Sequence, residues 1–227
     1  QKLTRVLTHE MMNSITPIAS LAGTIGSMLG NLRPSDDGKM NGETLDDIQG
    51  AASTIARRSE HLLDFVQQYR QLTRVPEPER EILEFRKLFD DVIQLVRTEE
   101  DAGDIDFVVD IQPESLQVSA DPNLLEQVLI NLIKNSIQAL RDGEAPRRIE
   151  LSANIDRRGR SVIRVIDNGP GIAAEAHDKV FLPFFTTKKE GSGIGLALSK
   201  QILRKHGGSL SLASEPEDGT TEFVLRF

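Results

Sequence analysis

Mostly apolar residues recur at alternating steps of four and three over most of the first seventy positions of the chain. The first run consists of Leu7, Met11, Ser14, Ile18, Leu21, Ile25, Met28 and Leu32, and the second of Leu45, Ile48, Ala52, Ile55, Ser59, Leu62, Val66 and Tyr69. This a/d spacing predicts two helices that pack along one seam. Turn-forming residues occupy positions 33–42 between the two runs, so we expect the helices to form a hairpin.

A hairpin of two long helices cannot enclose a hydrophobic core by itself. Pairing two copies of the hairpin produces a four-helix bundle, and a homodimer is therefore expected. The helical pattern stops at residues 75–81, where two prolines stand among charged residues, which is typical of a linker. The sequence thus predicts a dimerisation domain over residues 1–74, a linker over 75–81 and a second domain over 82–227.

The second domain combines two kinds of pattern. Helices are predicted near residues 86–101, 122–141 and 194–206. Strands are predicted at residues 107–111, 149–153, 161–166, 209–212 and 222–227. We therefore expect an α+β chain, in which this domain is an α/β sandwich with helices on one face of a mixed sheet. Residues 170–192, rich in Gly, Lys and Thr, are expected to form a loop that acts as a lid over a bound ligand.

The charge balance and the absence of cysteine exclude several classes of protein. The net charge is −8 over 227 residues, and no basic stripe is available to neutralise phosphates, which argues against direct nucleic-acid binding. Without cysteine, the chain has neither disulfides nor thiolate metal sites. No apolar run approaches the roughly 18–20 residues that span a bilayer. Because the chain starts at Gln1 in the middle of a helical pattern, we expect it to be the cytoplasmic part of a longer protein, attached to a membrane only through an upstream segment.

Three short motifs follow one another in the second domain: Asn131-Leu-Ile-Lys-Asn135, Asp167-Asn-Gly-Pro-Gly171 and Gly191-Ser-Gly-Ile-Gly-Leu196. The first places two carboxamides one turn apart on the same side of a helix. The second places a carboxylate at the end of an apolar strand, next to a glycine turn. The third is a glycine loop that leads into a helix, whose free N–H groups favour phosphate oxygens. Together these groups are suited to holding a magnesium nucleotide.

A fourth motif, Thr8-His9-Glu10-Met-Met-Asn13, lies near the start of the first helix. Because Leu7 and Met11 occupy the seam, His9 is expected on the outside of the bundle. An exposed histidine on a helix is usually inert, but here an acid follows it directly and an amide lies one turn later on the same face. A neutral imidazole, with an ordinary pKa of about 6.5, has a nucleophilic nitrogen at neutral pH. Glu10 can accept the hydrogen of the other ring nitrogen and stabilise the charge that grows as a phosphoryl group arrives.

In their order and wording, these motifs resemble those of the sensor histidine kinases of two-component systems. The ATP-binding domain of that family has the fold shared with gyrase, Hsp90 and MutL. The resemblance covers nearly the whole chain, and the stretches Thr16-Pro17-Ile18 and Pro183-Phe-Phe-Thr-Thr-Lys188 are similar to the nitrogen-regulation subclass.

The resemblance implies an ATP-dependent protein-histidine kinase that uses ATP and Mg²⁺. Such an enzyme phosphorylates its own histidine and passes the phosphoryl group to an aspartate in the receiver domain of a response regulator. The resemblance also implies phosphatase activity toward that regulator, and anchoring of the full-length protein in the bacterial inner membrane.

The resemblance also implies a role for each motif residue. His9 would accept the phosphoryl group with Glu10 as its hydrogen-bond partner, and Asn13 would position water against a phospho-aspartate. Asn135 would bind magnesium, and Asn131 would support the phosphates. The remaining nucleotide contacts would come from Asp167 at the adenine amino group and from Gly169, Gly171, Gly191, Gly193, Ile194, Gly195, Leu196 and Thr221.

The chain departs from the family pattern in two places. Ser14 stands where most members have a proline, and the proline comes at Pro17, which cannot donate to the carbonyl of Asn13 and is expected to bend the helix. Gln138 stands where a basic residue is more frequent in the family, so one phosphate contact is expected either to be weaker or to come from Lys188. The start of the 170–192 loop is expected to pack against the domain through Phe181, Phe184 and Phe185.

Two other classes of function remain compatible with these motifs. A signalling scaffold or pseudokinase would bind ATP and a partner without transferring phosphate. A conformational ATPase of the gyrase type would share the nucleotide site but would not need the histidine hairpin. Intact His9, Glu10, Asn135 and Asp167 favour the kinase, and the fate of labelled phosphate separates the three classes.

Overall fold

The chain forms two compact units, Gln1–Thr73 and Arg74–Phe227. The computed structural model describes residues 2–30, 42–99, 102–141, 143, 146–188, 191–213 and 220–227, with the backbone alone for residues 2–10, 30, 42 and 43. The turn expected at residues 33–42 lies outside the described residues, except for Gly42. Among the helices of the described ranges, none is long and apolar enough to cross a bilayer.

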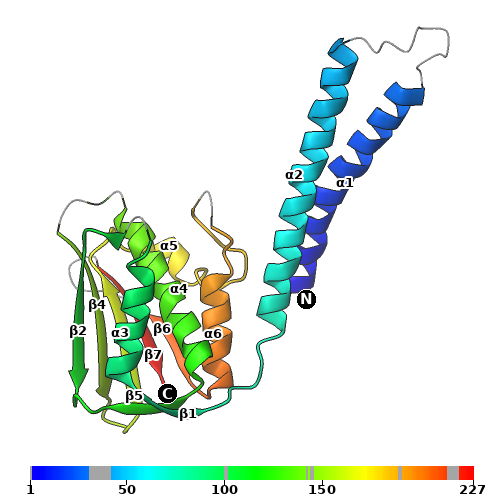
Figure 1. Ribbon diagram of the computed structural model, residues 1–227. Coiled ribbons are helices and arrows are strands. Elements are labelled where there is room, and N and C mark those ends of the chain that lie inside the picture. The colour runs from blue at the N-terminus through cyan, green and yellow to red at the C-terminus, as the bar shows by residue number, and fades with distance from the viewer. Residues whose placement is uncertain are drawn as a thin grey trace. The chain divides into compact units, whose positions relative to one another are not determined.

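Two long helices, α1 (Lys2–Gly30) and α2 (Gly42–Thr73), pack along each other in the first unit (Figure 1). From Met11 onward, the half-buried residues of α1 are those of the predicted seam together with Pro17: Met11, Ser14, Pro17, Ile18, Leu21, Ile25 and Met28. α1 runs through Pro17 without ending. The prediction of two helices packed along one seam is therefore confirmed.

The seam on α2 follows the prediction over most of its length. The predicted seam residues that are half-buried are Ile48, Ile55, Ser59, Leu62, Val66 and Tyr69. Toward the start of α2 the prediction is wrong, because Leu45 and Ala52 are exposed and Ala51 is half-buried instead. A helix of 3.6 residues per turn drifts by about 20° per heptad against a strict seven-residue repeat, so the seam moves to neighbouring positions.

A five-stranded sheet organises the second unit, with the strand order β2-β4-β5-β7-β6. The strands are β2 (Ile105–Gln112), β4 (Arg147–Ile155), β5 (Ser161–Asp167), β6 (Ser209–Leu212) and β7 (Thr221–Arg226). β2 and β4 are parallel, and the other neighbours are antiparallel. One face of the sheet is covered by α3 (Phe85–Val96), α4 (Pro122–Leu140) and α6 (Gly195–Lys205) (Figure 1). This is the expected α/β sandwich.

Three short elements escaped prediction. β1 (Glu81–Glu84) and β3 (Gln117–Ala120) pair antiparallel in a separate two-stranded sheet. α5 (Ala174–His177) lies within the segment that was expected to be a loop. Each of these elements has four residues, which is too short for a periodic pattern to emerge. The helix expected over residues 86–101 also ends earlier, at Val96.

α4 belongs both to the hydrophobic core and to the site, because it carries the residues of the first motif on one side and packs on the sheet with the other. It packs on β4 and β5, and its fully buried side chains are Leu125, Val128, Leu129, Leu132 and Ile133. The helix begins as predicted, because Oδ1 of Asp121 accepts a hydrogen bond from the N–H of Leu124 at 3.1 Å and Pro122 occupies the first turn. Since α4 also carries Asn131 and Asn135, packing of its apolar side sets the position of both carboxamides.

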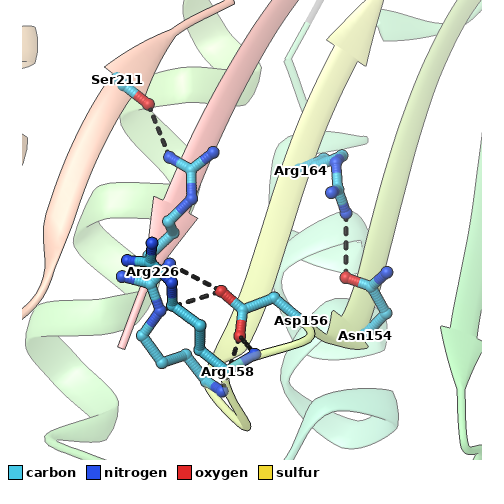
Figure 2. A network of polar contacts seen from close by, with 7 residues as sticks. Asn154, Asp156, Arg158, Arg164, Ser211 and Arg226 are labelled. Atoms are coloured by element: carbon cyan, nitrogen blue, oxygen red, sulfur yellow. Dashed lines mark hydrogen bonds and ion pairs between the residues drawn. The ribbon is translucent and has the colours of Figure 1, made fainter.

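The face of the sheet that lies away from the helices is polar (Figure 2). On this face Arg164 donates to Oδ1 of Asn154 at 2.9 Å, and Arg226 donates to Oγ of Ser211 at 3.0 Å. Side chains alternate between the two faces of a strand, so Arg164 lies opposite its buried neighbours Ile163 and Val165. The hydrophobic core therefore lies between the sheet and the three helices.

Asp156 closes the hairpin between β4 and β5. Its Oδ1 accepts hydrogen bonds from the N–H groups of Arg158 at 2.8 Å and Arg160 at 3.0 Å. The guanidinium of Arg160 donates to Oδ2 at 2.7 and 2.9 Å. The backbone and side-chain hydrogen bonds from Arg160 lower the pKa of Asp156 to about 2.

The predicted linker, residues 75–81, belongs to the second unit and is held to its helices. The N–H of Glu79 donates to Oδ2 of Asp121 at 2.9 Å, and Glu77 forms an ion pair with Lys205 at the end of α6. Val75 is buried. Residues 75–81 are therefore held to the N-terminus of α4 and the C-terminus of α6.

A buried histidine ties the same two helices together. The N–H of Asp121 donates to Nε2 of His206 at 3.0 Å, and Nδ1 of His206 lies 2.9 Å from the carbonyl oxygen of Ile202. Since Nε2 accepts, the proton resides on Nδ1 and the ring is a neutral donor–acceptor bridge. No motif in the sequence indicated this contact, because its two residues lie 85 positions apart.

Candidate functional site

Asp167 is the buried carboxylate at the end of β5, with 2% of its surface exposed. Its Oδ2 accepts a hydrogen bond from the hydroxyl of Ser136 at 2.7 Å, and its Oδ1 accepts one from the N–H of Gly169 at 3.1 Å. Burial raises the pKa of Asp167, while the hydrogen bonds from Ser136, Gly169 and Thr221 and the charge of Lys188 oppose this rise. The result is a strong hydrogen-bond acceptor in largely apolar surroundings, the environment that favours recognition of an amino group.

The predicted site residue Thr221 meets Asp167 across the sheet. Thr221 is the first residue of β7 and lies directly opposite Asp167 in the antiparallel β5–β7 ladder. Its side chain is buried and hydrogen-bonds to the Asp167 carboxylate. Ser136 completes this cluster from α4, and the sequence analysis missed it although it directly follows Asn135 in the first motif.

The glycines of the second motif fit closely around the carboxylate. A Cβ added at Gly169 would lie 2.8 Å from Oδ1 of Asp167, which is too close for a real side chain. Gly171 adopts a φ of +75°, the left-handed region that favours glycine. The backbone therefore turns tightly beside Asp167 and leaves no side chain between this turn and the carboxylate.

Asn131 braces α4 against the first turn of α6. Its Nδ2 donates to Oγ of Ser199 at 3.0 Å. A Cβ added at Gly195 would lie only 1.9 Å from Oδ1 of Asn131. Glycine at 195 is thus what permits the two helices to approach, and Asn131 positions the glycine loop that precedes α6.

Lys188 meets Asn135 and Gln138 close to the carboxylate of Asp167. Nζ of Lys188 donates to Oε1 of Gln138 at 2.7 Å and to Oδ1 of Asn135 at 3.4 Å. Desolvation lowers the pKa of Lys188, and the nearby charge of Asp167 partly opposes this effect. The ammonium group expected from the sequence thus lies next to the amide oxygen that was expected to bind magnesium.

The glycine loop is folded against the segment that carries the phenylalanines. A Cβ added at Gly193, whose φ is +67°, would lie 2.6 Å from the carbonyl carbon of Phe184. The N–H of Phe184 donates to the carbonyl of Gly193 at 2.8 Å, and Phe184 itself has a φ of +65°. A Cβ at Gly191 would lie 2.5 Å from Oγ1 of Thr186. Each of these two glycines therefore permits a close approach.

The loop leads into α6 with a bare helix start. Ile194 is buried at the N-cap and its side chain makes no capping hydrogen bond, while Leu196 in the first turn is half-buried. The helix begins at Gly195, one residue after the predicted start. The side chain at the N-cap does not hydrogen-bond to the first N–H groups of the helix. These groups can therefore donate to phosphate oxygens, as expected from the sequence.

Phe181 anchors the segment before the glycine loop. Its ring packs edge-on against Phe223 of β7 with a centroid distance of 6.3 Å, and Nζ of Lys200 lies 4.5 Å from the ring centroid. For Phe181, this agrees with the prediction that the phenylalanines pack the segment against the domain. The prediction of a loop over residues 170–192 is wrong in one respect, because α5 lies within it.

The residues of the fourth motif belong to the other unit. His9, Glu10 and Asn13 all lie within α1, and Asn13 is exposed as expected. The side chains of His9 and Glu10 lie outside what the structure describes. Within the described part of the chain, no group of three or more His, Asp or Glu side chains could hold a metal ion. The amide oxygen of Asn135 remains the candidate metal ligand.

Comparison with known proteins agrees with the family resemblance seen in the motifs. The family described as "Histidine kinase-, DNA gyrase B-, and HSP90-like ATPase" matches residues 120–227. The chain is 42% identical over 124 residues to the C4-dicarboxylate transport sensor protein DctB of Rhizobium meliloti, covering 53% of this chain and 19% of DctB. It is 29% identical over 219 residues to the nitrogen regulation protein NtrY of Azorhizobium caulinodans, covering 94% of this chain and 27% of NtrY. The chain thus spans less than a third of each of these relatives.

Solved structures extend the likeness to both units. The catalytic domain of the histidine kinase ThkA matches with a TM-score of 0.58 and 31% identity, over 66% of this chain and 95% of that domain. ThkA in complex with the response regulator protein TrrA matches with a TM-score of 0.64 and 25% identity, over 100% of this chain and 61% of that one. The match to NtrY is consistent with the nitrogen-regulation subclass. The chain belongs to the sensor histidine kinases, with an ATP-binding domain of the type shared with DNA gyrase B and Hsp90.

Proposed function

We propose that this chain transfers the γ-phosphoryl group of ATP to His9 and then to an aspartate in the receiver domain of a response regulator. The observation that carries the proposal is the cluster around the buried carboxylate of Asp167. This carboxylate can accept a hydrogen bond from the adenine amino group, and the ammonium of Lys188 and the amide of Asn135 lie nearby. The complex of the related kinase ThkA with its response regulator protein TrrA supports the choice of partner.

The nucleotide is bound by residues from all three motifs of the second unit. Asp167 accepts a hydrogen bond from the adenine amino group, and Thr221 lies at the edge of the same base. The turn at Gly169 and Gly171 admits the ring. The phosphates lie toward Asn131, Lys188 and the loop of Gly191, Gly193, Ile194, Gly195 and Leu196.

The residues present fit a magnesium ion. The amide oxygen of Asn135 is a hard donor, and its contact with the ammonium of Lys188 at 3.4 Å supports a position suited to a cation. Asn135 would hold the ion together with phosphate oxygens and water. Magnesium bound there would neutralise charge on the phosphate oxygens as the γ-phosphoryl group departs.

The phosphotransfer itself needs little more than correct positioning. A ring nitrogen of His9 attacks the γ-phosphorus, the bond from that phosphorus to the bridging oxygen breaks, and ADP leaves with the electron pair. Glu10 accepts the hydrogen of the other ring nitrogen and stabilises the imidazolium. A carboxylate oxygen of the regulator aspartate then takes the phosphoryl group from His9, which returns to the neutral form. In the separate phosphatase reaction, Asn13 orients a water that attacks the phosphorus of the phospho-aspartate, which releases inorganic phosphate and restores the aspartate carboxylate.

The chain acts as a homodimer through its helical hairpin. A second set of large apolar side chains on α1 and α2 is 42–62% exposed in the single chain: Met12, Ile15, Leu29, Leu45 and Leu63. Ile15 and Leu29 are two heptads apart, and Leu45 and Leu63 are separated by five turns of 3.6 residues, so each pair lies along one line of its helix. Covering these stripes with a second hairpin produces a four-helix bundle.

The proposal assigns residues 1–74 to dimerisation and histidine phosphotransfer, residues 75–81 to a linker and residues 82–227 to ATP binding. We place the chain in the cytoplasm, with membrane attachment through an upstream segment of the whole protein.

Incubation of the chain with γ-labelled ATP and Mg²⁺ tests the proposal. The protein should take up label that is stable in alkali and labile in acid, as expected of phosphohistidine. His9→Gln should take up none, while its ATP affinity stays unchanged because the acceptor and the nucleotide site lie on separate units. Label uptake by His9→Gln at the wild-type rate would show that another residue is the acceptor. ATP binding without label would indicate a scaffold, and ATP hydrolysis without label a conformational ATPase.

A further inference from the structure

The position of Lys188 depends on a glutamine that the family resemblance left without a role. Oε1 of Gln138 accepts a hydrogen bond from Nζ of Lys188 at 2.7 Å, a shorter contact than the 3.4 Å between Nζ and Oδ1 of Asn135. Gln138 lies three residues after Asn135 on α4, so the two amides face the same side of the helix. The ammonium is thus held by two amide oxygens from one helix.

The neutral character of this partner matters. A carboxylate at position 138 would form an ion pair with Lys188 and compensate its charge, whereas an amide oxygen fixes the ammonium and leaves its charge available to an anion. The neighbouring Lys134 shows the other arrangement, because its ammonium forms an ion pair with Glu99 at 2.8 Å. Of these two lysines, Lys188 is the one held by uncharged groups next to Asn135.

We propose that Gln138 is a positioning residue, which holds the Lys188 ammonium beside Asn135 so that this ammonium neutralises the phosphates of the bound nucleotide. The inference rests on the proposed function, since it concerns the same nucleotide. In related kinases a basic residue is more frequent at this position. Here the positive charge comes from Lys188, in the segment that precedes the glycine loop, and α4 contributes the amide oxygens that hold it.

The chain offers a matched control on the same helix. Gln127 is exposed and lies eleven residues before Gln138, which places it about 16 Å away along α4 at 1.5 Å per residue. Gln127→Ala removes the same side chain from the same helix without touching Lys188. A general effect of this substitution on α4 would appear in both variants.

Calorimetric titration of the full chain with MgATP, MgADP and adenosine tests the inference in a double-mutant cycle. Lys188→Ala should weaken ATP binding by about tenfold or more, and Gln138→Ala by about three- to tenfold, since hydrogen bonds and contacts to charged groups are of this strength. Adenosine affinity should not change in either variant. In the Lys188→Ala background, Gln138→Ala should have no further effect, because there is no ammonium left to position.

A second variant separates positioning from packing. Gln138→Glu keeps an acceptor for Lys188 but adds a negative charge, so it should weaken binding of ATP more than that of ADP and leave adenosine unaffected. Equal losses for ATP and adenosine, or a full loss from Gln138→Ala in the Lys188→Ala background, would overturn the inference in favour of a structural role. If Asp167→Asn weakens ATP binding but Gln138→Ala matches Gln127→Ala, only this inference fails. If the wild-type chain binds no ATP, the proposed function fails with it.

Discussion

Replacement of Asp167 by asparagine changes the chemistry of the nucleotide site while keeping its shape. The carboxylate accepts hydrogen bonds from the hydroxyl of Ser136 and the N–H of Gly169. In the variant, the amide oxygen can keep the bond to Gly169, and the amide nitrogen can donate to Ser136, whose hydroxyl can rotate to accept. The fold should therefore tolerate the substitution.

The effect on adenine recognition follows from the donors and acceptors. Only a carboxylate presents acceptors on both oxygens, so the asparagine amide directs a donor toward the adenine amino group or leaves that group without its partner. An opposed or unsatisfied buried pair costs about 1–3 kcal/mol. ATP affinity should therefore fall by about 5- to 140-fold, at 1.4 kcal/mol per factor of ten. GTP binding should be little affected, because guanine carries an acceptor oxygen at the corresponding position.

Stability should change in the opposite direction. Burial raises the pKa of Asp167 above its ordinary value of 3.8, so the native state holds its proton more tightly than the unfolded state. The ionised carboxylate therefore lowers stability above the raised pKa, and this loss develops as pH rises from 3.8 through that value. Asp167→Asn removes the charge, so the variant should gain stability relative to wild type at pH 7, and the gain should disappear as pH falls through the same window.

Two measurements on the same preparations decide the outcome. Calorimetric titration with ATP and GTP gives the affinities. Thermal unfolding between about pH 3.5 and 7 gives the stabilities, because an aspartate with a raised pKa titrates within this range. Wild-type affinity for ATP in Asp167→Asn would remove Asp167 from the site. A variant unfolded at pH 7 would refute the argument that Ser136 adapts to the amide.

Other changes address the hairpin and the glycine loop. Asn13→Ala should keep substantial autophosphorylation but slow dephosphorylation of the regulator by about 10²-fold, and equal decay of phospho-regulator with both proteins, measured with a non-transferable nucleotide, would contradict this. Gly193→Ala should lower the free energy of unfolding by about 2 kcal/mol or more and weaken ATP binding, because its φ is positive and its Cβ would meet Phe184. Gly103→Ala, with open space around its Cβ, should change stability by less than about 0.5 kcal/mol in thermal unfolding, and similar losses in both variants would refute the steric argument. The fragment of residues 1–74 should sediment as a helical dimer, and a folded monomer would contradict the bundle.

Local pattern determined much of this protein. The heptads identified α1 and most of the seam on α2. Because two helices cannot enclose a hydrophobic core by themselves, the heptads also predicted a second copy of the hairpin. The helix predicted near residues 122–141 starts where expected, and the structure shows the local reason: Asp121 caps α4 and Pro122 occupies its first turn. The motifs at Asn135 and Asp167 were visible because each requires residues that are close together in the chain.

Tertiary structure alone decided how these groups combine. Ser136 reaches Asp167 across 31 residues, Gln138 reaches Lys188 across 50, and His206 reaches Asp121 across 85. Such partners are set by the order of strands in the sheet and by the packing of α4 and α6 on it, which no short-range periodicity encodes. The sequence therefore specified the chemical groups and the helices that carry them, whereas the folded sheet selected their partners, because long-range pairing depends on the whole core being formed at once.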